Sequence, residues 1–172
     1  MKTLLLLRHG KSDWKADYAE DLDRPLAKRG KRAAALMGRY LAELAELPDR
    51  VYTSPALRAR DTARRAVVAG GWSRPVETCE RLYGGPPDQI VELIREADEG
   101  AGCIILVGHE PDASLIASGL TGGTSVRFPT AAMARIDLGV ERWDETGFGK
   151  GTLIWLVTPK LLAGIGWPDG VS

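Results

Sequence analysis

Two short apolar runs, each followed by a histidine, organise the pattern of hydrophobic and polar positions along this chain. Residues 2–7 read Lys-Thr-Leu-Leu-Leu-Leu, and residues 103–107 read Cys-Ile-Ile-Leu-Val. Apolar continuity over so short a length predicts a buried strand inside a parallel sheet. His9 and His109 follow these runs, so we expect both imidazoles at strand ends, where open α/β sheets bind ligands.

Helical spacing of apolar residues predicts the layer that covers this sheet. A long helix ending near Pro48 is indicated by apolar positions three and four residues apart. These positions are Ala33, Leu36, Met37, Tyr40, Leu41, Leu44 and Leu47. After a short strand at 50–53, Ser54 and Pro55 offer an N-cap and a first helical residue for a second helix that runs to about Val68. Strands that alternate with helices predict an α/β fold with a mostly parallel central sheet.

The second half of the chain continues this alternation. The expected elements are an extended piece at 75–78, helices at about 88–98 and 113–120, and strands at 132–138 and 152–157. No internal repeat or linker divides the chain, so we expect residues 1–172 to form a single domain. The C-terminal segment, residues 160–172, shows no periodicity and is expected to be loosely held.

Composition narrows the compartment and the kind of partner. Lys plus Arg and Asp plus Glu both number 23, so no global field favours nucleic acid or an anionic membrane as a partner. The two cysteines match neither a metal-ligand spacing nor a disulfide framework, which fits a reducing compartment. The N-terminal apolar stretch is too short for a signal peptide or a membrane span. We therefore expect a cytoplasmic protein with no metal site.

Charge is nevertheless grouped near the N-terminus. Acidic residues dominate positions 13–23. Five basic residues follow with no acid among them, namely Arg24, Lys28, Arg29, Lys31 and Arg32. Such blocks are typical of a solvated loop that leads into a helix face, and they also fit a docking surface for a partner. The sequence leaves both interpretations open.

The combination of Arg8, His9 and Gly10 at a strand end suits a phosphoryl group. Arginine matches phosphate oxygens bidentately, histidine can form a covalent intermediate, and glycine relaxes the turn. Taken alone, a histidine after a strand can also be purely structural. A nucleotide P-loop, which Gly10-Lys11-Ser12 suggests, is excluded because that motif needs a glycine at position 5, where Leu5 stands.

Arg58 stands at the junction of the second strand and its helix. An arginine in a first helical turn can reach an anion that the free N–H groups of the helix already favour. The alternative is a surface arginine paired with Asp61 or Thr62 on the same helix. Arg58 alone does not distinguish these interpretations, so its motif has to be considered together with the two histidine motifs.

Three motifs in this order resemble the histidine phosphatase superfamily, which includes the cofactor-dependent phosphoglycerate mutases. They are Leu7-Arg8-His9-Gly10, Ser54-Pro55-Ala56-Leu57-Arg58-Ala59 with Thr62-Ala63, and Gly108-His109-Glu110. The short chain, with Arg24-Pro25-Leu26 and Phe128-Pro129-Thr130, is similar to the SixA-type phosphohistidine phosphatase branch. The resemblance implies a three-layer α/β/α sandwich of the phosphoglycerate mutase type.

The resemblance also implies a mechanism. His9 attacks phosphorus and becomes phosphorylated, while Arg8, Arg58 and His109 hold the phosphoryl oxygens, with Gly10 at the phosphate site. Water then hydrolyses phospho-His9, and neither a metal nor a cofactor is required. Because the attacking nitrogen of His9 must be unprotonated, we expect its other ring nitrogen to donate to a backbone carbonyl.

The proton donor and the substrate remain open at this point. Glu80 resembles the acid of a mutase-type loop, Glu110 sits where another branch keeps an acidic residue, and SixA-like proteins can act without a dedicated acid. The resemblance favours phosphohistidine on a partner protein, in a signalling role, as the substrate. The alternatives are hydrolysis of a small phosphoester and a non-catalytic phosphate-binding regulatory module.

Overall fold

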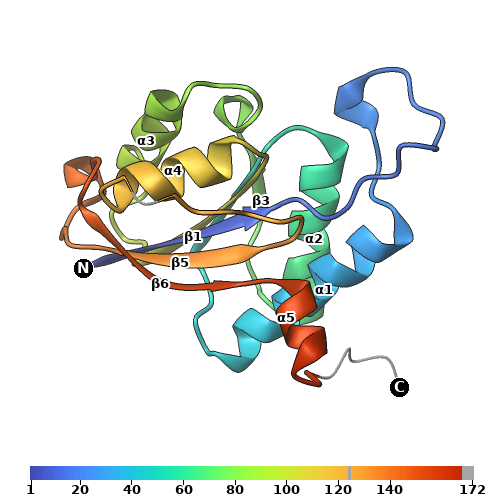
Figure 1. Cartoon of the computed structure of the whole chain (residues 1–172). Coiled ribbons are helices and arrows are strands. Elements are labelled where there is room, and N and C mark those ends of the chain that lie inside the picture. Colours follow the sequence, from blue (N-terminus) through green and yellow to red (C-terminus); the bar gives the residue numbers. More distant parts are fainter. Residues whose placement is uncertain (124, 168–172) are drawn as a thin grey trace.

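A computed structural model describes residues 1–123 and 125–167, and it shows one six-stranded sheet with helices on both faces (Figure 1). The strands are β1 (Lys2–Arg8), β2 (Arg50–Thr53), β3 (Val76–Thr78), β4 (Cys103–Gly108), β5 (Met133–Leu138) and β6 (Gly151–Val157). Their order across the sheet is β3-β2-β4-β1-β5-β6. The pairs from β3 to β1 are parallel, whereas β5 and β6 join as antiparallel strands. This arrangement confirms the predicted α/β/α sandwich with a mostly parallel sheet.

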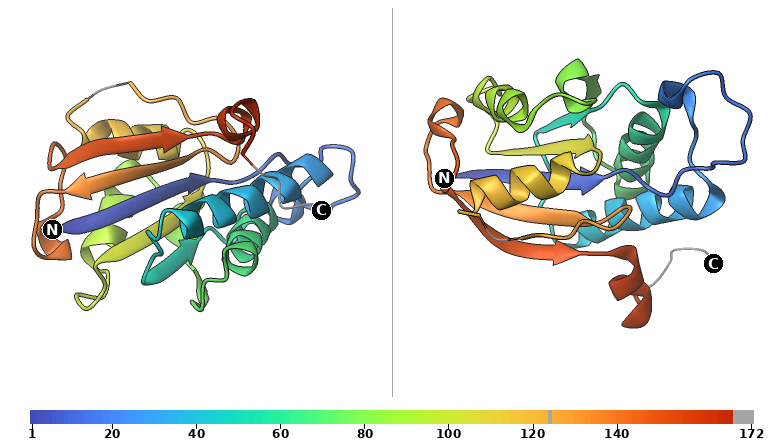
Figure 2. Two further views of the ribbon diagram at one scale, coloured as in Figure 1. Left: turned by 90° about the horizontal axis from the view of Figure 1, so that it is seen from below. Right: turned by 45° about the horizontal axis from the view of Figure 1, so that its top comes forward.

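The helices form the two outer layers (Figure 2). They are α1 (Lys28–Glu43), α2 (Leu57–Gly70), α3 (Pro87–Arg95), α4 (Asp112–Leu120) and α5 (Pro159–Gly164). Apolar side chains of α1, α2 and α5 pack on one face of the sheet, and those of α3 and α4 pack on the other. Short 3-10 helices occur at η1 (Asp21–Asp23), η2 (Glu80–Leu82) and η3 (Trp143–Glu145). No helix in the described part of the chain is long and apolar enough to cross a membrane.

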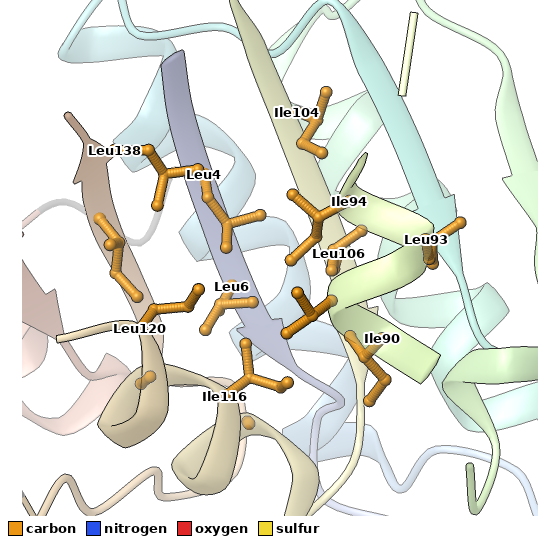
Figure 3. Packing of buried hydrophobic residues seen from close by; sticks show 14 of the residues in the cluster. Leu4, Leu6, Ile90, Leu93, Ile94, Ile104, Leu106, Ile116, Leu120 and Leu138 are labelled. Carbon is orange, nitrogen blue, oxygen red and sulfur yellow. The ribbon is translucent and has the colours of Figure 1, made fainter. Parts of the chain in front are cut away.

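The leucine run of β1 serves both layers at once. Leu4 and Leu6 belong to the cluster that faces α3 and α4 (Figure 3), whereas Leu5 and Leu7 belong to the cluster that faces α1 and α2. Successive side chains of a strand point to opposite faces, and all four leucines are at most 4% exposed. A strand covered on both faces therefore has to be continuously apolar.

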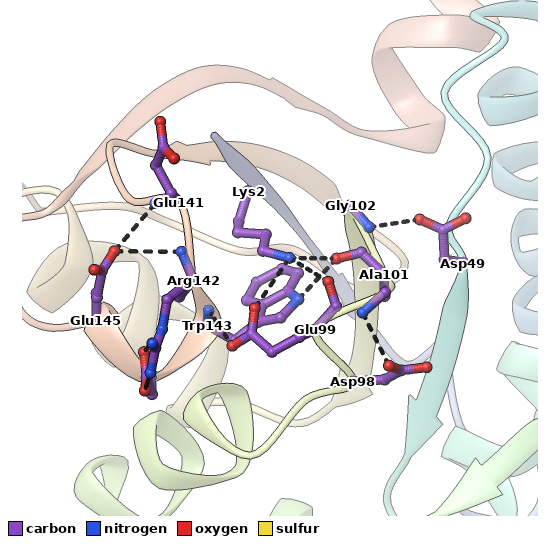
Figure 4. Close-up of polar contacts among 12 residues, drawn as sticks. Lys2, Asp49, Asp98, Glu99, Ala101, Gly102, Glu141, Arg142, Trp143 and Glu145 are labelled. Atoms are coloured by element: carbon purple, nitrogen blue, oxygen red, sulfur yellow. Dashed lines mark hydrogen bonds and ion pairs between the residues drawn. The ribbon is translucent and has the colours of Figure 1, made fainter.

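A buried lysine, Lys2, is the first residue of β1 and anchors the N-terminal end of that strand (Figure 4). Lys2 is 6% exposed, and its Nζ donates to the carbonyl oxygens of Glu99 at 2.8 Å and Ala101 at 2.9 Å. The ammonium also lies 5.3 Å from the ring centroid of Trp143, whose Nε1 donates to the same Ala101 oxygen. These contacts compensate for the loss of water around the charge.

Two helix boundaries differ from the predictions. The helix expected to reach Pro48 ends at Glu43, because the chain turns at Ala45 with φ of 54° to enter β2. Leu44 and Leu47 consequently leave the buried face and are 37% and 42% exposed. The second helix begins at Leu57 with Ala56 as its N-cap, so the prediction of Ser54 as the N-cap is wrong.

The prediction of a loose segment from residue 160 is also wrong for its first part. Thr158 caps α5, with its Oγ1 accepting from Leu161 N at 3.1 Å, and Pro159 fits the first helical position. Leu162 is buried, and the ring centroids of Trp167 and Tyr40 lie 5.3 Å apart. Residues 168–172 lie outside the described part.

The close approach of α1 and α2 at Gly38 gives a stability prediction. A Cβ at Gly38 would lie 2.1 Å from Ala66 O on α2. Gly38→Ala is therefore expected to lower the free energy of unfolding by about 2 kcal/mol, despite the better helix propensity of alanine. Denaturant unfolding measures this change. Gly164→Ala, where the added Cβ meets nothing within 4 Å, is the control, and equal effects in both variants would contradict the close packing.

Candidate active site

The candidate site lies where β1, β2 and β4 end side by side. His9 follows β1, Ser54 follows β2 and His109 follows β4. The ladder hydrogen bonds continue past the strands, since His9 N donates to Gly108 O at 2.9 Å and Ser54 N donates to Val107 O at 3.0 Å. The ring centroids of the two histidines are 5.0 Å apart. Strand pairing thus brings together two imidazoles that are 100 positions apart in the sequence.

The orientation of His9 leaves one ring nitrogen for chemistry. His9 is 8% exposed, and its Nδ1 lies 2.7 Å from Gly10 O. This carbonyl is the backbone acceptor expected from the sequence, and donation from Nδ1 places the lone pair on Nε2. Burial lowers the pKa of His9 to about 4, and the charges of Arg58 and Arg8 act in the same direction. The imidazole is therefore neutral at pH 7.

His109 is held by the serine that was expected to cap α2. Its Nε2 lies 2.7 Å from Ser54 Oγ, and this hydroxyl also accepts from Ala56 N at 3.3 Å. Burial lowers the pKa of His109 to about 3, and repulsion from His9 when that ring is protonated and from the charge of Arg58 acts in the same direction. Ser54 is fully buried. Its hydroxyl orients His109 and does not cap the start of α2.

Three arginines surround the histidines. Arg58, in the first turn of α2, is 5% exposed, so it is not the surface arginine of the alternative interpretation. Arg8 donates from Nη1 to Phe128 O at 2.7 Å, and Arg24 is 7% exposed. The Nε atoms of Arg8 and Arg58 are buried without a hydrogen-bond partner among the described residues. Buried donors without acceptors suit an anion.

Asp21 is the anion that the chain itself supplies to these arginines. Arg58 donates from Nη1 to Asp21 O at 2.6 Å and from Nη2 to Asp21 Oδ2 at 2.9 Å. Arg24 Nε donates to Asp21 Oδ1 at 3.0 Å, and Tyr83 Oη donates to Oδ2 at 3.2 Å. Partial burial opposes ionisation, but the charges of Arg58 and Arg24 outweigh it and lower the pKa of Asp21. The sequence analysis placed Asp21 only in an acidic block and did not predict this role.

Tyr83 is a second residue that the sequence analysis missed. Its ring meets His109 edge-on with centroids 5.5 Å apart, and the guanidinium carbon of Arg58 lies 6.0 Å from the same ring. Glu80 begins η2 three residues earlier, is exposed, and makes no side-chain hydrogen bond or ion pair with the described residues. In this segment the Tyr83 ring therefore contacts His109 directly.

Glu110, the other candidate acid, is engaged at the start of α4. Its Oε1 accepts from Ser114 Oγ at 2.7 Å and its Oε2 from Ser114 N at 3.3 Å. Burial lowers the pKa of Arg8, and the charge of Glu110 opposes that shift. These contacts favour a structural role for this carboxylate.

Gly10 is needed for close packing of the loop after β1. A Cβ at Gly10 would lie 2.7 Å from Gly30 O in the first turn of α1. Gly10 N donates to Thr62 Oγ1 at 3.0 Å, and this hydroxyl donates to Arg58 O at 2.7 Å. Gly10 was expected at the phosphate site, but its N–H is already bonded within the chain, and the absence of a Cβ allows the loop to sit between α1 and α2.

These residues form a cluster in which positively charged arginines surround a neutral imidazole. Arginine donors favour an anion with several oxygens, and the free Nε2 of His9 can attack its central atom. Within the described residues no group of three or more His, Cys, Asp or Glu side chains could hold a metal ion. The arrangement suits transfer of a phosphoryl group to histidine.

Comparisons with known proteins agree on one family. A family model described as the histidine phosphatase superfamily (branch 1) matches residues 4–83. An uncharacterized protein of Mycobacterium leprae is 32% identical over 166 residues, which cover 90% of this chain and 100% of that protein. The matched residues include the first histidine motif and the Arg58 motif.

Solved structures are similar over nearly the whole chain. The protein histidine phosphatase SixA in complex with tungstate superimposes with a TM-score of 0.81 at 26% identity, covering 93% of this chain and 99% of that chain. A phosphoserine phosphatase from Entamoeba histolytica has a TM-score of 0.66 at 15% identity and covers 94% and 100% of the two chains. The second comparison shows a shared fold.

The two neutral histidines predict a loss of stability in acid. Their pKa values in the folded protein, about 4 and about 3, lie below the value of about 6.5 expected in the unfolded chain. The unfolded chain therefore takes up these protons first as the pH falls below about 6.5. At pH 5 each histidine should lower the free energy of unfolding by about 2 kcal/mol relative to pH 7.5.

Denaturant unfolding at the two pH values measures this loss. In His109→Gln the difference between pH 7.5 and pH 5 should shrink by about 2 kcal/mol, because one of the two groups is gone. An undiminished difference in that variant would contradict a buried, neutral His109.

Proposed function

We propose that this chain, which belongs to the histidine phosphatase superfamily, removes phosphate from phosphohistidine on a partner protein through a phosphorylated His9. Membership of this superfamily supports phosphatase activity. The phosphohistidine substrate is what we add as a proposal. The observation that carries the proposal is the buried, neutral His9, whose Nδ1 is bonded to Gly10 O beside Arg8 and Arg58. The similarity to SixA supports the same substrate class.

The first step forms a bond between His9 Nε2 and phosphorus while the bond from phosphorus to the substrate nitrogen breaks. The free Nε donors of Arg8 and Arg58 hold phosphoryl oxygens during this transfer. Because these Nε atoms are buried and both guanidinium groups are held by hydrogen bonds to the chain, they stabilise the charge without reorganisation. The departing imidazole keeps the electron pair of the broken bond and takes a proton from water.

His109 supplies a further donor in this scheme. When the Ser54 hydroxyl donates to His109 Nε2, Nδ1 carries the hydrogen of the neutral ring. That N–H is free to donate to a phosphoryl oxygen held beside His9, whose ring centroid is 5.0 Å away. Ser54 thus fixes the tautomer of His109 that carries its hydrogen on Nδ1, the nitrogen that donates to the phosphate.

The second step releases His9. A water molecule attacks phosphorus, the bond to Nε2 breaks, and the electron pair returns to the imidazole. The product is inorganic phosphate, and the hydrogen bond from Nδ1 to Gly10 O is retained throughout. Since the pKa of His9 is lowered to about 4, the ring returns to its neutral form at pH 7.

The nature of the leaving group favours phosphohistidine over a phosphoester. An alkoxide needs a proton as it departs, whereas the imidazole of phosphohistidine leaves more readily. Glu80, the candidate donor, is exposed, and its side chain makes no hydrogen bond or ion pair with a described residue. A small phosphoester remains the alternative substrate, and a non-catalytic phosphate-binding module is disfavoured because Arg8, His9, Arg58 and His109 are all present.

The covalent intermediate is directly testable. Purified protein incubated with a phosphohistidine peptide should carry phosphate on His9 when examined by mass spectrometry without acid. His9→Asn should lose at least about a thousandfold in kcat/KM, since no nucleophile remains. An unfolding curve close to that of the parent protein shows that the variant is folded. Phosphate found only at another residue, or turnover undiminished in His9→Asn, would refute the mechanism.

The role of Glu80 separates the two substrate classes. Glu80→Gln should change kcat/KM for the phosphohistidine peptide by less than about twofold, because no acid is required for that leaving group. Glu77→Gln, an exposed position on β3, is the matched control. A parent protein that hydrolyses a small phosphoester better than the peptide, and loses a hundredfold or more of that phosphoester activity in Glu80→Gln alone, about the size of a general-acid contribution, would instead assign the chain to phosphoesters.

A further inference from the structure

A basic groove lies beside the candidate site, between α1, α5 and the loop that precedes β5. Its volume is about 570 Å³, which is within the range of about 300–1,000 Å³ typical of ligand clefts. Four exposed cations line it, namely Lys11, Arg29, Arg32 and Lys160. No acidic residue is found among the described residues of its lining.

The charge of this groove is not neutralised within the chain. None of the four cations forms a side-chain hydrogen bond or ion pair with any described residue. Several arginines outside the groove are paired, since Arg135 pairs with Glu46 and Asp137, and Arg65 pairs with Asp61, whereas the groove gathers four unpaired cations around one hollow. In a chain with a net charge of zero, this local excess identifies a surface that suits an anionic partner.

The shape of the groove follows from the local elements. Arg29, Arg32, Ala33 and Leu36 are spaced by three and four residues, so they share one face of α1. Lys160 lies on α5, which packs beside α1 (Figure 1). Arg29 and Arg32 thus lie on α1, Lys160 lies on α5 and Lys11 lies on the loop after β1, and the apolar side chains of Ala33, Leu36 and Pro129 line the same groove.

The groove is joined to the candidate site through the chain. Lys11 comes two residues after His9. On the other wall, Thr130 precedes Ala131, whose N–H donates to His9 O at 3.1 Å. Both walls of the groove thus include residues that are direct neighbours of His9 or of a residue hydrogen-bonded to it.

We infer that this groove binds an acidic segment of the partner protein, next to the phosphorylated residue that enters the site. The inference rests on the proposed function and adds the chemistry of the flanking sequence. The described lining contains no aromatic side chain, so it offers no platform on which nucleobases could stack. Ala33, Leu36 and Pro129 instead suit the aliphatic parts of a peptide. Attraction between opposite charges would speed encounter and would weaken with added salt.

Charge reversal on both walls tests the inference. In Arg29→Glu/Lys160→Glu, a fluorescent peptide of about ten residues rich in Asp and Glu should bind at least about tenfold more weakly at low salt. The control is Arg64→Glu/Lys150→Glu, which makes the same change in net charge at two exposed cations without recorded partners outside the groove. It should change the Kd less than about twofold. Arg29→Gln/Lys160→Gln should give an intermediate loss.

Activity adds a second readout. For a phosphohistidine peptide with acidic flanks, kcat/KM should fall about tenfold in Arg29→Glu/Lys160→Glu, the groove variant. For the same peptide with Asn and Gln flanks, and for free phosphohistidine, it should change less than about twofold. Arg29→Glu/Lys160→Glu and the control Arg64→Glu/Lys150→Glu are the two variants to compare. Equal kcat/KM for the acidic phosphohistidine peptide in these two variants, or equal Kd values for the unphosphorylated acidic peptide, would overturn the inference.

Binding and turnover also separate this inference from the proposed function. If the parent protein binds the acidic peptide through the groove but does not hydrolyse phosphohistidine, the proposed function fails while the groove assignment is supported. A single-stranded oligonucleotide that binds more tightly than the acidic peptide, and loses this affinity in the groove variant, would refute the peptide assignment.

Discussion

The parallel pairing of β1 with β4 is the interaction on which the site depends. Arg8 pairs with Gly108 in the strand register, and His9 N extends the ladder to Gly108 O. Each added ladder bond aligns the next residue of both strands, so the register that buries the leucines also sets the two imidazoles 5.0 Å apart. A slip of one residue would make each leucine face the opposite helical layer and would separate the histidines. Core packing and site geometry are therefore the same constraint.

Burial then determines the chemical state of the residues so aligned. Histidines that lose their water in the presence of arginines stay neutral, as the lowered pKa values of His9 and His109 indicate. Arginines remain charged, and part of that charge is balanced by Asp21. The pocket thus combines uncharged nitrogen bases with fixed positive charge, a combination that suits attack on an electron-rich phosphoryl group.

Much of the fold and the principal histidines could be predicted from the sequence, because they depend on local pattern. The leucine run predicted β1, and the motifs around His9, Arg58 and His109 predicted residues that do meet. Asp21 and Tyr83 could not be predicted, because they reach Arg58 and Asp21 across separations of 37 and 62 residues. Ser54 was misassigned for a related reason: its hydroxyl had a tertiary partner, His109, 55 residues away.

Asp21 also bears on how the site empties. Its carboxylate is attached to the chain, so it contends for Arg58 at an effective concentration that dilution of the protein does not change. A phosphate ion can use the Nη2 donor of Arg58 only by displacing this carboxylate, so Asp21 limits the number of donors that hold a released phosphate. It favours clearance of the site after each turnover.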